Sequence, residues 1–326
     1  MSLVPKPHIP FFRSAKDFSN FFTSSKTTST VSVALGNFDG VHLGHQSLIE
    51  NLASSSNSKE SSAFKLVMSL RPHPKKYFSN SFKILSSLEE KIEALRDAGC
   101  THYVEERFTK DFRDLSPEDF VQHIVLDQLR ASNVVVGEDY RFGKSRGGDA
   151  EFILKLSKKL NFGVTIVPDF NKSQVRVSSG RVKELLAEGL VDEVSELLGR
   201  DFSIIGRVVS GGKRGDSLTG FPTINFRRRC DLITPADGVY VSLLQHGGEL
   251  RPSVTNIGLR PSVDGHNRFI ETHILEGSIG EVYGQKFKVF LKERLRDELK
   301  FSSIEELRKA ISLDVKKAKE WFKSNG

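Results

Sequence analysis

Two histidines three positions apart, near the N-terminus of the 326-residue chain, have a spacing that could bring both imidazoles to one phosphate group. His42 and His45 lie in the segment Gly36-Asn37-Phe38-Asp39-Gly40-Val41-His42-Leu43-Gly44-His45. The segment follows an apolar run and leads into a helical pattern, and the N–H groups at a helix N-terminus attract anions. Two imidazoles there could stabilise charge on a phosphoryl group in transfer, and Gly44 would let a nucleotide approach the backbone. On spacing alone, a metal-binding pair or two structural loop histidines account for the pattern equally well.

A second glycine-rich segment, from Gly206 to Gly220, contains adjacent cations and could wrap a polyphosphate through its backbone N–H groups. Gly215 and Gly220 have the spacing of a P-loop, but Phe221 stands where that motif requires lysine. A Walker site is therefore excluded. The alternative interpretation is a plain glycine-rich turn before a strand.

Polar side chains follow this loop at the period of an extended chain. If Thr223 and Asn225 lie in a strand, their hydroxyl and amide oxygens share one face and offer hard oxygen ligands to Mg²⁺. Glu271 and His273 likewise share a face of the run Arg268–Leu275, and a carboxylate there could take the proton from an attacking hydroxyl. Taken alone, an exposed strand glutamate is the simpler explanation of Glu271.

The first half of the chain has the alternating pattern of a parallel sheet covered by helices. Short apolar runs predict strands at Val31–Leu35, Phe64–Leu70, His102–Glu105, Asn133–Val136 and Gly163–Val167. Helical patterns cover His45–Ala53, Pro117–Leu129, Asp149–Leu160 and Ser179–Leu198. Ser87 before Glu90, and Ser116-Pro117 before Asp119, are helix start signals. The histidine segment then lies at a strand's carboxyl end, where open α/β sheets bind ligands.

After residue 199 strand-like runs follow one another without a long helix, which is typical of a small antiparallel sheet or barrel. The runs are Ile204–Val209, Gly238–Leu244, Pro252–Ile257, Phe269–Leu275 and Phe287–Leu291. A closing helix is expected from about Ser303. Its barrel-facing side comprises Ile304, Leu307, Ile311, Val315, Ala318 and Phe322. The predicted domains are residues 1–198 and 199–326.

Composition excludes several classes of protein. The chain is 38% hydrophobic and 27% charged, and it contains no apolar run of the roughly 18 residues that a membrane span needs. Cys100 and Cys230 are too few and too far apart for a disulfide framework or a cysteine zinc site, which favours a reducing, cytoplasmic location. The net charge of +7 allows an anionic partner, either nucleic acid or a phosphorylated small molecule. Nucleic acid is not expected, because the basic residues are interleaved with acids.

The histidine segment resembles the His-x-Gly-His signature of the nucleotidyltransferase superfamily. In detail it is similar to the FMN adenylyltransferase module of the prokaryotic bifunctional riboflavin kinase/FAD synthetases. Further stretches resemble that family in order, namely Arg71-Pro72-His73-Pro74, Leu115-Ser116-Pro117-Glu118-Asp119-Phe120 and Gly137-Glu138-Asp139-Tyr140-Arg141-Phe142-Gly143. The resemblance implies a Rossmann-like α/β nucleotidyltransferase domain with a parallel sheet.

This resemblance implies that His42 and His45 bind ATP phosphates and stabilise adenylyl transfer. The implied nucleotide-binding residues are Gly36, Asn37, Phe38, Asp39, Gly44, Ser178, Ser179 and Arg181. Asp139, Arg141 and Gly143 are implied on the flavin side, although Asp139 taken alone would be a loop acid that caps a turn. One element departs from the family's Ile-Ser-Ser-Thr-Arg-Ile-Arg, because Gly180 and Lys183 replace a threonine and an arginine. The exchange removes a hydroxyl and a planar fork suited to phosphate, so weak adenylyl transfer is compatible with this sequence.

The second glycine-rich segment ends in Gly220-Phe221-Pro222-Thr223-Ile224-Asn225, which resembles the Gly-Phe-Pro-Thr-Ala-Asn motif of riboflavin kinases. Further stretches of that family follow in order: Gly238-Val239-Tyr240, Asn256–Ser262, Ile270–Leu275 and Leu295–Phe301. The resemblance implies a six-stranded barrel in which Thr223 and Asn225 hold Mg²⁺ with ATP, Glu271 is the general base, and Arg296 lies near the flavin. The implied ATP-loop residues are Gly206, Gly211, Lys213, Gly215 and Gly220. Ile224 in place of alanine, and one extra residue between Gly215 and Gly220, depart from the pattern.

Together these resemblances predict a bifunctional enzyme that phosphorylates riboflavin to FMN with ATP and then joins FMN to AMP from a second ATP, which yields FAD and pyrophosphate. The expected partners are small molecules, with neither nucleic acid nor membrane, and the expected state is a monomer or weak homo-oligomer. A riboflavin kinase with a weak or inactive adenylyltransferase domain is the nearest alternative. A flavin-binding protein without turnover is a further one, which the intact His42, His45, Thr223, Asn225 and Glu271 disfavour.

Overall fold

The computed structural model of the chain describes residues 8–53, 64–209, 223–262, 265–277 and 282–325. Gly211, Lys213, Gly215 and Gly220 of the predicted ATP loop lie outside the described residues. The chain divides into two compact units, Val4–Ser179 and Gly180–Gly326. This division precedes the predicted boundary after residue 198, which remains a prediction about the functional modules.

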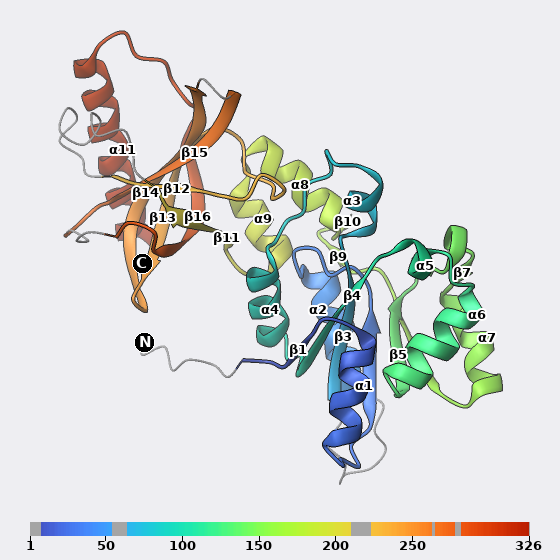
Figure 1. The fold of residues 1–326 in the computed structure, drawn as a ribbon. Helices are drawn as coiled ribbons and strands as arrows, with labels where there is room; N and C mark the ends of the chain where they lie inside the picture. Colours follow the sequence, from blue (N-terminus) through green and yellow to red (C-terminus); the bar gives the residue numbers. More distant parts are fainter. Residues whose placement is uncertain (1–7, 54–63, 210–222, 263–264, 278–281, 326) are drawn as a thin grey trace. The chain divides into compact units, whose positions relative to one another are not determined.

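The Val4–Ser179 unit is built on a six-stranded parallel sheet in the order β1-β4-β3-β2-β5-β8 (Figure 1). The strands are β1 (Phe11–Phe12), β2 (Val31–Leu35), β3 (Phe64–Arg71), β4 (His102–Arg107), β5 (Ala131–Gly137) and β8 (Gly163–Val167). The five predicted strands are confirmed, whereas the two-residue edge strand β1 has no alternating pattern to reveal it. The chain proceeds from β2 to β3 and β4 on one side, and from β5 to β8 on the other. The strand order therefore reverses between β2 and β5, which is where open α/β sheets bind ligands.

Helices cover both faces of this sheet and bury two apolar cores. One core lies under α1 (Ala15–Ser24), η2 (Phe120–Gln128) and α7 (Ala150–Leu160), and the other under α2 (Leu43–Glu50), η1 (Asn51–Ala53) and α4 (Leu88–Asp97). Val33 and Ala34 of β2 are both fully buried but belong to different cores, because successive side chains of a strand point to opposite faces. The remaining elements are short: α3 (Pro74–Phe78), α5 (Lys110–Arg113), α6 (Pro117–Asp119), η3 (Lys144–Arg146), and the strand pairs β6 (Arg141–Phe142) with β7 (Gly148–Asp149) and β9 (Asn171–Lys172) with β10 (Val175–Arg176).

The predicted helix starts are confirmed by capping hydrogen bonds. The Ser87 side chain accepts the N–H of Glu90, and the Glu90 carboxylate accepts the N–H of Ser87 at 2.7 Å, which completes a capping box at α4. The Ser116 side chain accepts the N–H of Asp119 at the start of α6. The next turns, η2, continue this helix with wider winding, so the predicted stretch Pro117–Leu129 is helical throughout in two forms.

His102 at the start of β4 gives the Val4–Ser179 unit a pH-dependent stability. Its ring stacks on Phe64 at 4.2 Å between centroids and contacts the rings of Phe12, Phe18 and Phe21. Burial in this apolar cluster lowers the pKa of His102. The unfolded chain therefore binds a proton more readily than the folded one, and stability falls as pH drops below about 6.5, by at most about 1.4 kcal/mol per pH unit.

We expect His102→Phe to lose less stability than the wild type when the pH is lowered. Urea unfolding at pH 7.5 and pH 5.5, followed by circular dichroism, measures the loss for both proteins. An equal loss in the two proteins would contradict a role for His102 protonation.

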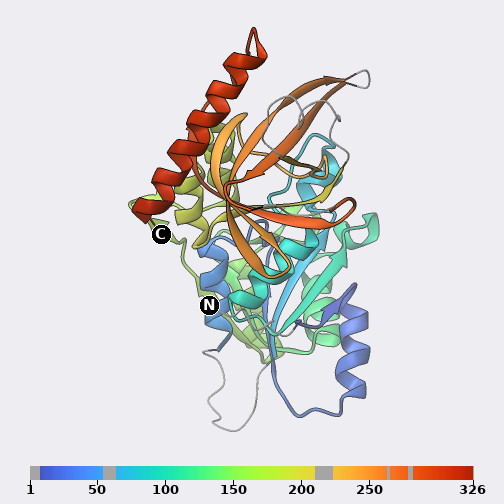
Figure 2. The ribbon, with the colours of Figure 1, turned by 90° about the vertical axis from the view of Figure 1, so that its left-hand side faces the viewer.

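The Gly180–Gly326 unit is a closed antiparallel barrel in the order β11-β12-β15-β14-β13-β16. Its strands are β11 (Phe202–Val208), β12 (Thr223–Arg227), β13 (Gly238–His246), β14 (Glu249–Ser262), β15 (Gly265–Ile274) and β16 (Lys286–Arg296). The helix α11 (Ile304–Asn325) runs along the outside of the barrel (Figure 2). Ala318 of α11 packs there with Val239, Val241 and Val254. The predicted fold of both halves is confirmed.

Two helix predictions need correction. The single helix expected over Ser179–Leu198 is two helices, α8 (Ser179–Glu188) and α9 (Val191–Leu198), because Gly189 between them has a φ of +82°. A side chain at this glycine would also meet Arg294 of β16, with a Cβ only 2.8 Å from its Cδ.

The second correction concerns α11, in which Ile304 is 44% exposed and does not pack on the barrel, whereas Asp314 is buried on that side. Asp314 was missed because an acid is expected to face solvent, and its ion pair with Arg296 is visible only in three dimensions.

Candidate functional site

The Gly36–His45 segment connects β2 to α2 at the carboxyl end of β2, beside the point where the strand order reverses. His42 is the N-cap of α2, and its Nδ1 accepts the N–H of His45 at 3.4 Å. The rings of the two histidines stack at 3.7 Å between centroids, and the His45 ring also lies 5.0 Å from the ring of Phe38. Because Nδ1 of His42 is an acceptor, neutral His42 carries its proton on Nε2, where it can be donated to an anion. The structure therefore brings the two predicted histidines together at a helix N-terminus.

The loop before the histidines has a strained backbone. Phe38, Gly40 and Val41 have φ angles of +49°, +85° and +44°, a region that residues with a side chain rarely adopt. A Cβ at Gly40 would also lie only 2.7 Å from a methyl carbon of Leu85. Such strain persists only where surrounding contacts over-determine the conformation.

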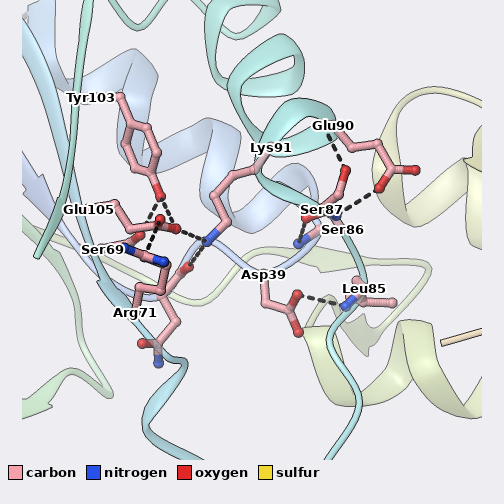
Figure 3. Close-up of polar contacts among 12 residues, drawn as sticks. Asp39, Ser69, Arg71, Leu85, Ser86, Ser87, Glu90, Lys91, Tyr103 and Glu105 are labelled. Atoms are coloured by element: carbon pink, nitrogen blue, oxygen red, sulfur yellow. Dashed lines mark hydrogen bonds and ion pairs between the residues drawn. The ribbon is translucent and has the colours of Figure 1, made fainter. Parts of the chain in front are cut away.

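Contacts from the approach to α4 hold this loop (Figure 3). The buried Asp39 carboxylate accepts the N–H of Leu85 at 2.8 Å, and the Gly40 N–H donates to the hydroxyl of Ser86 at 3.3 Å. The Lys91 ammonium donates to the carbonyl of Asn37 at 3.2 Å. Asp39 thus supports the loop through its side chain, a role that its predicted place in a nucleotide-binding segment did not specify.

The predicted second nucleotide-binding element lies against the same loop. The Ser179 hydroxyl donates to the carbonyl of Asp39 at 2.8 Å. Gly44 of the histidine segment also lies close to this second element, because a Cβ at Gly44 would be 3.5 Å from the carbonyl oxygen of Val177 and 3.2 Å from Nδ1 of His42. Ser178 and Ser179 are therefore next to the histidine segment, as the sequence predicts for one site. Arg181 belongs to the other compact unit, which begins at Gly180, and forms an ion pair with Glu184 at 3.3 Å.

The predicted flavin-side residues lie in the loop that follows β5, the other strand at the reversal point. The Asp139 carboxylate accepts a hydrogen bond from Arg176, which also pairs with Asp169 at 2.6 Å. The Arg141 guanidinium is exposed and donates to the carbonyl of Tyr140. Gly143 has a φ of +70°, and a Cβ there would lie 2.9 Å from the backbone nitrogen of Pro117.

Arg176 was not predicted as a site residue. The available signal was its position two residues before the Ser178-Ser179 pair. Its ion pairs join the Asp139 loop to the strand that leads to those serines, a connection that only the fold reveals.

An exposed group of aromatic rings also lies at the carboxyl edge of the sheet and was missed. Tyr77 and Phe78 of α3 are 39% and 67% exposed, and both rings make edge contacts with Phe108, which follows β4. A gathering of exposed rings marks a binding surface more often than isolated apolar residues do. The signal in the sequence was the motif Arg71-Pro72-His73-Pro74, which directly precedes these rings.

In the barrel unit the register brings the predicted kinase residues together. Asn225 of β12 pairs directly with Glu271 of β15, and Thr223 pairs with His273. Directly paired residues have side chains on the same face, so the Thr223 hydroxyl, the Asn225 amide and the Glu271 carboxylate share one face of two adjacent strands. The condition that Thr223 and Asn225 lie in a strand is confirmed.

The shared face is the outer face of the barrel. Glu271 pairs with Asn256 of the adjacent strand β14, and Asn256 pairs in turn with Val239 of β13. Val239 packs against α11, which lies outside the barrel. Arg296 ends the same row, because it pairs with Val239 from β16. Three interstrand steps of about 4.8 Å each separate Arg296 from Glu271 along this row. The Arg296 guanidinium forms three hydrogen bonds with the Asp314 carboxylate of α11, at 2.9, 3.2 and 2.7 Å, and is therefore held in place.

The barrel interior behind Glu271 contains a chain of buried hydroxyl groups that sequence reasoning missed. The Ser242 hydroxyl lies 2.8 Å from those of Ser253 and Thr255, and Thr255 lies 2.9 Å from Thr272. All four residues are fully buried. The chain links β13, β14 and β15 and so fixes the strand that carries Glu271. The sequence signal for this chain was the serine or threonine residues within the strand-like runs of the second half, which were interpreted as apolar.

Gly206 of β11, predicted in the ATP loop, has a packing reason of its own. A Cβ there would collide with the ring of Phe226 and lie 2.9 Å from the carbonyl of Arg227. The absence of a side chain at Gly206 therefore permits the close approach of β11 and β12. A role of Gly206 in ATP binding remains a prediction.

Within the described residues, no cluster of three or more His, Cys, Asp or Glu side chains is arranged to hold a metal ion. The Thr223 and Asn225 oxygens, by contrast, are the hard neutral donors that suit Mg²⁺ when phosphate oxygens supply the other ligands. In the same part of the chain, helices of the length and apolarity required to cross a bilayer do not occur.

Comparison with known proteins assigns each half of the chain to a family. A family model described as FAD synthetase matches residues 24–181, and one described as riboflavin kinase matches residues 198–322. The bifunctional riboflavin kinase/FMN adenylyltransferase of Escherichia coli (strain K12) is 34% identical over 293 residues, which cover 89% of this chain and 92% of that protein. The chain belongs to the bifunctional riboflavin kinase/FMN adenylyltransferase family. The predicted family is confirmed.

Other members of this bifunctional family match over a similar length. The enzyme of the same name from Buchnera aphidicola subsp. Schizaphis graminum (strain Sg) is 32% identical over 303 residues, which cover 91% of this chain and 96% of that protein. A crystal structure named as a macrolide-efflux protein from Streptococcus pneumoniae is 26% identical, has a TM-score of 0.84, and covers 97% of this chain and all of that one. Matches to both family models favour two activities over a kinase alone.

Proposed function

We propose that the chain catalyses two consecutive reactions, each with the residues of one predicted domain. Residues 199–326 phosphorylate riboflavin to FMN with ATP, and residues 1–198 adenylylate FMN to FAD with release of pyrophosphate. The observation that carries the proposal is that each set of predicted catalytic side chains is gathered within one unit, Glu271 with Asn225 in the barrel and His42 with His45 at the sheet.

In the kinase reaction, Glu271 accepts the proton of the ribityl 5′-hydroxyl while the hydroxyl oxygen attacks the γ-phosphorus of ATP and ADP leaves. Thr223 and Asn225 would hold Mg²⁺, which when bound neutralises charge on the ATP phosphates. The fixed strand register keeps the carboxylate beside these two side chains, so catalysis relies on positioning as much as on proton transfer.

In the adenylyl transfer, a phosphate oxygen of FMN attacks the α-phosphorus of ATP and pyrophosphate leaves. His42 and His45 donate hydrogen bonds to the phosphate oxygens that gain charge, together with the N–H groups at the start of α2. Ser179, which contacts the Asp39 carbonyl, keeps the second nucleotide element next to the loop.

Flavin binding in the sheet unit is assigned to Asp139, Arg141 and Gly143, and Arg296 serves the flavin of the barrel unit. The exposed rings of Tyr77 and Phe78 offer further planar surface to an isoalloxazine at the carboxyl edge of the sheet. We assign the enzyme to the cytoplasm, as a monomer or weak homo-oligomer that acts on small molecules. Cys100 and Cys230 are not joined in a disulfide, which suits a reducing compartment.

The test is chromatographic separation of riboflavin, FMN and FAD after incubation of the purified protein with riboflavin, ATP and Mg²⁺, beside a reaction started from FMN. We expect FAD in both reactions. FMN without FAD in the first, and unchanged FMN in the second, would instead identify a riboflavin kinase whose adenylyltransferase site is silenced by Gly180 and Lys183.

A further inference from the structure

Lys91 of α4 is a buried lysine next to the strained loop that carries the histidines. Only 9% of the residue is exposed, and its ammonium donates to the Asn37 carbonyl at 3.2 Å (Figure 3). Burial lowers the pKa of Lys91, while the nearby negative charges of Glu105 and Asp39 oppose this effect. Burying an amine lowers the stability of the folded state unless a partner compensates its charge, so the buried position of Lys91 indicates that it has such partners or a function.

Glu105 of β4 supplies the opposite charge and is itself firmly held. Its carboxylate lies 3.9 Å from the Lys91 ammonium and 3.2 Å from Nε of Arg71, and it accepts the hydroxyl of Tyr103 at 3.1 Å. Because Tyr103 donates its only hydroxyl proton to Glu105, the Ser69 hydroxyl donates to Tyr103, at 2.6 Å. Arg71, Lys91 and Tyr103 thus each present a donor group to this carboxylate.

Lys91 is one of three points at which the start of α4 supports the loop. The Leu85 N–H holds the Asp39 carboxylate, and the Ser86 hydroxyl accepts the Gly40 N–H. Lys91 supplies the one contact of the three in which the donor is a charged side chain, and it donates to the carbonyl that directly precedes Phe38. Phe38 is the first residue of the loop with a positive φ, and its ring lies against His45. A shift of the Asn37 carbonyl would therefore be passed to the histidine ring.

We propose that Lys91 is a positioning residue for adenylyl transfer: held by Glu105, its ammonium fixes the Asn37 carbonyl and so keeps the loop in the conformation that places His42 and His45 at the phosphates. The proposal rests on the adenylyltransferase function proposed above. It differs from a purely structural ion pair, in which Lys91 only neutralises Glu105.

Two variants separate these roles. Lys91→Met leaves Glu105 buried beside an apolar chain and should lower both stability and adenylyl transfer. The double variant Lys91→Met/Glu105→Gln removes both members of the ion pair and should recover most of the lost stability, because position 105 no longer holds a buried charge beside an apolar chain. If Lys91 positions the loop, kcat/KM for FAD formation from FMN stays reduced in the double variant, by about 10²-fold for a loop displaced by an ångström.

Tyr103→Phe is the matched control. It removes the hydroxyl that donates to Glu105 but leaves the Lys91–Asn37 contact in place, so it should lower the melting temperature while kcat/KM for FAD formation stays near the wild-type value. FMN formation from riboflavin, measured on the same preparations, should be unchanged in all variants because Lys91 lies outside the barrel unit.

The decisive measurement is kcat/KM for ATP in FAD formation by the double variant, at a temperature where melting curves indicate that it is folded. A reduced value supports the positioning role, also where Lys91→Met alone does not fold. A wild-type value in the double variant would overturn this role and leave the adenylyltransferase function standing. Wild-type protein that forms no FAD from FMN would overturn that function, and the role of Lys91 with it.

Discussion

Glu271→Gln is expected to lower FMN formation from riboflavin by about 10²–10⁴-fold, the usual contribution of a general base. The amide keeps the size of the side chain opposite Asn225 but cannot accept the proton of the 5′-hydroxyl. FAD formation from supplied FMN should persist, because Glu271 belongs to the barrel unit alone. Steady-state rates of both half-reactions, started from riboflavin and from FMN, measure the effect.

Glu249→Gln is the control for this variant, because Glu249 is an exposed barrel glutamate at the start of β14 whose partner is Arg251. Both half-reactions should be unaffected by it. A comparable loss of both reactions in Glu271→Gln would refute the assignment of two independent sites. Unchanged FMN formation would refute the role of Glu271 as the base.

His45→Ala should have the reciprocal effect, with FAD formation reduced by about 10²–10³-fold and FMN accumulating from riboflavin. The substitution removes a donor to the phosphates and also the ring that stacks on His42 and lies against Phe38. Time courses from riboflavin, analysed by chromatography, should end at FMN.

His123 provides the matched histidine control, because it is exposed on η2 and pairs with Asp127 at 3.2 Å. His123→Ala should leave FAD formation at the wild-type rate. An unchanged FAD yield in His45→Ala would remove that histidine from the mechanism, whereas loss of FMN formation as well would indicate damage beyond one unit.

The sequence alone was sufficient for the fold of both halves and for the membership of the family. Apolar runs such as Val31–Leu35 and helix start signals such as Ser87 with Glu90 are local patterns. They can be recognised without knowing which other elements the strand or helix packs against. The same holds for His42 and His45, because their separation of three positions at the start of a helix is enough to predict that their side chains lie near each other. The elements missed were those without local pattern, such as β1, or those altered by one residue, such as the helix broken at Gly189.

Several site relations depend on residues far apart in the chain, which no local pattern encodes. The sequence suggested that Thr223 and Asn225 share a face, but only the strand register placed Glu271 opposite Asn225. Lys91 and Glu105 looked like an ordinary helix lysine and the end of a strand, and only the packing of α4 on β4 made them a buried pair beneath the histidine loop. The sequence by itself thus determined which chemical groups the protein has and the elements that carry them. The tertiary structure decided which of those groups meet, because long-range packing sets the distances on which charge pairing and hydrogen bonding depend.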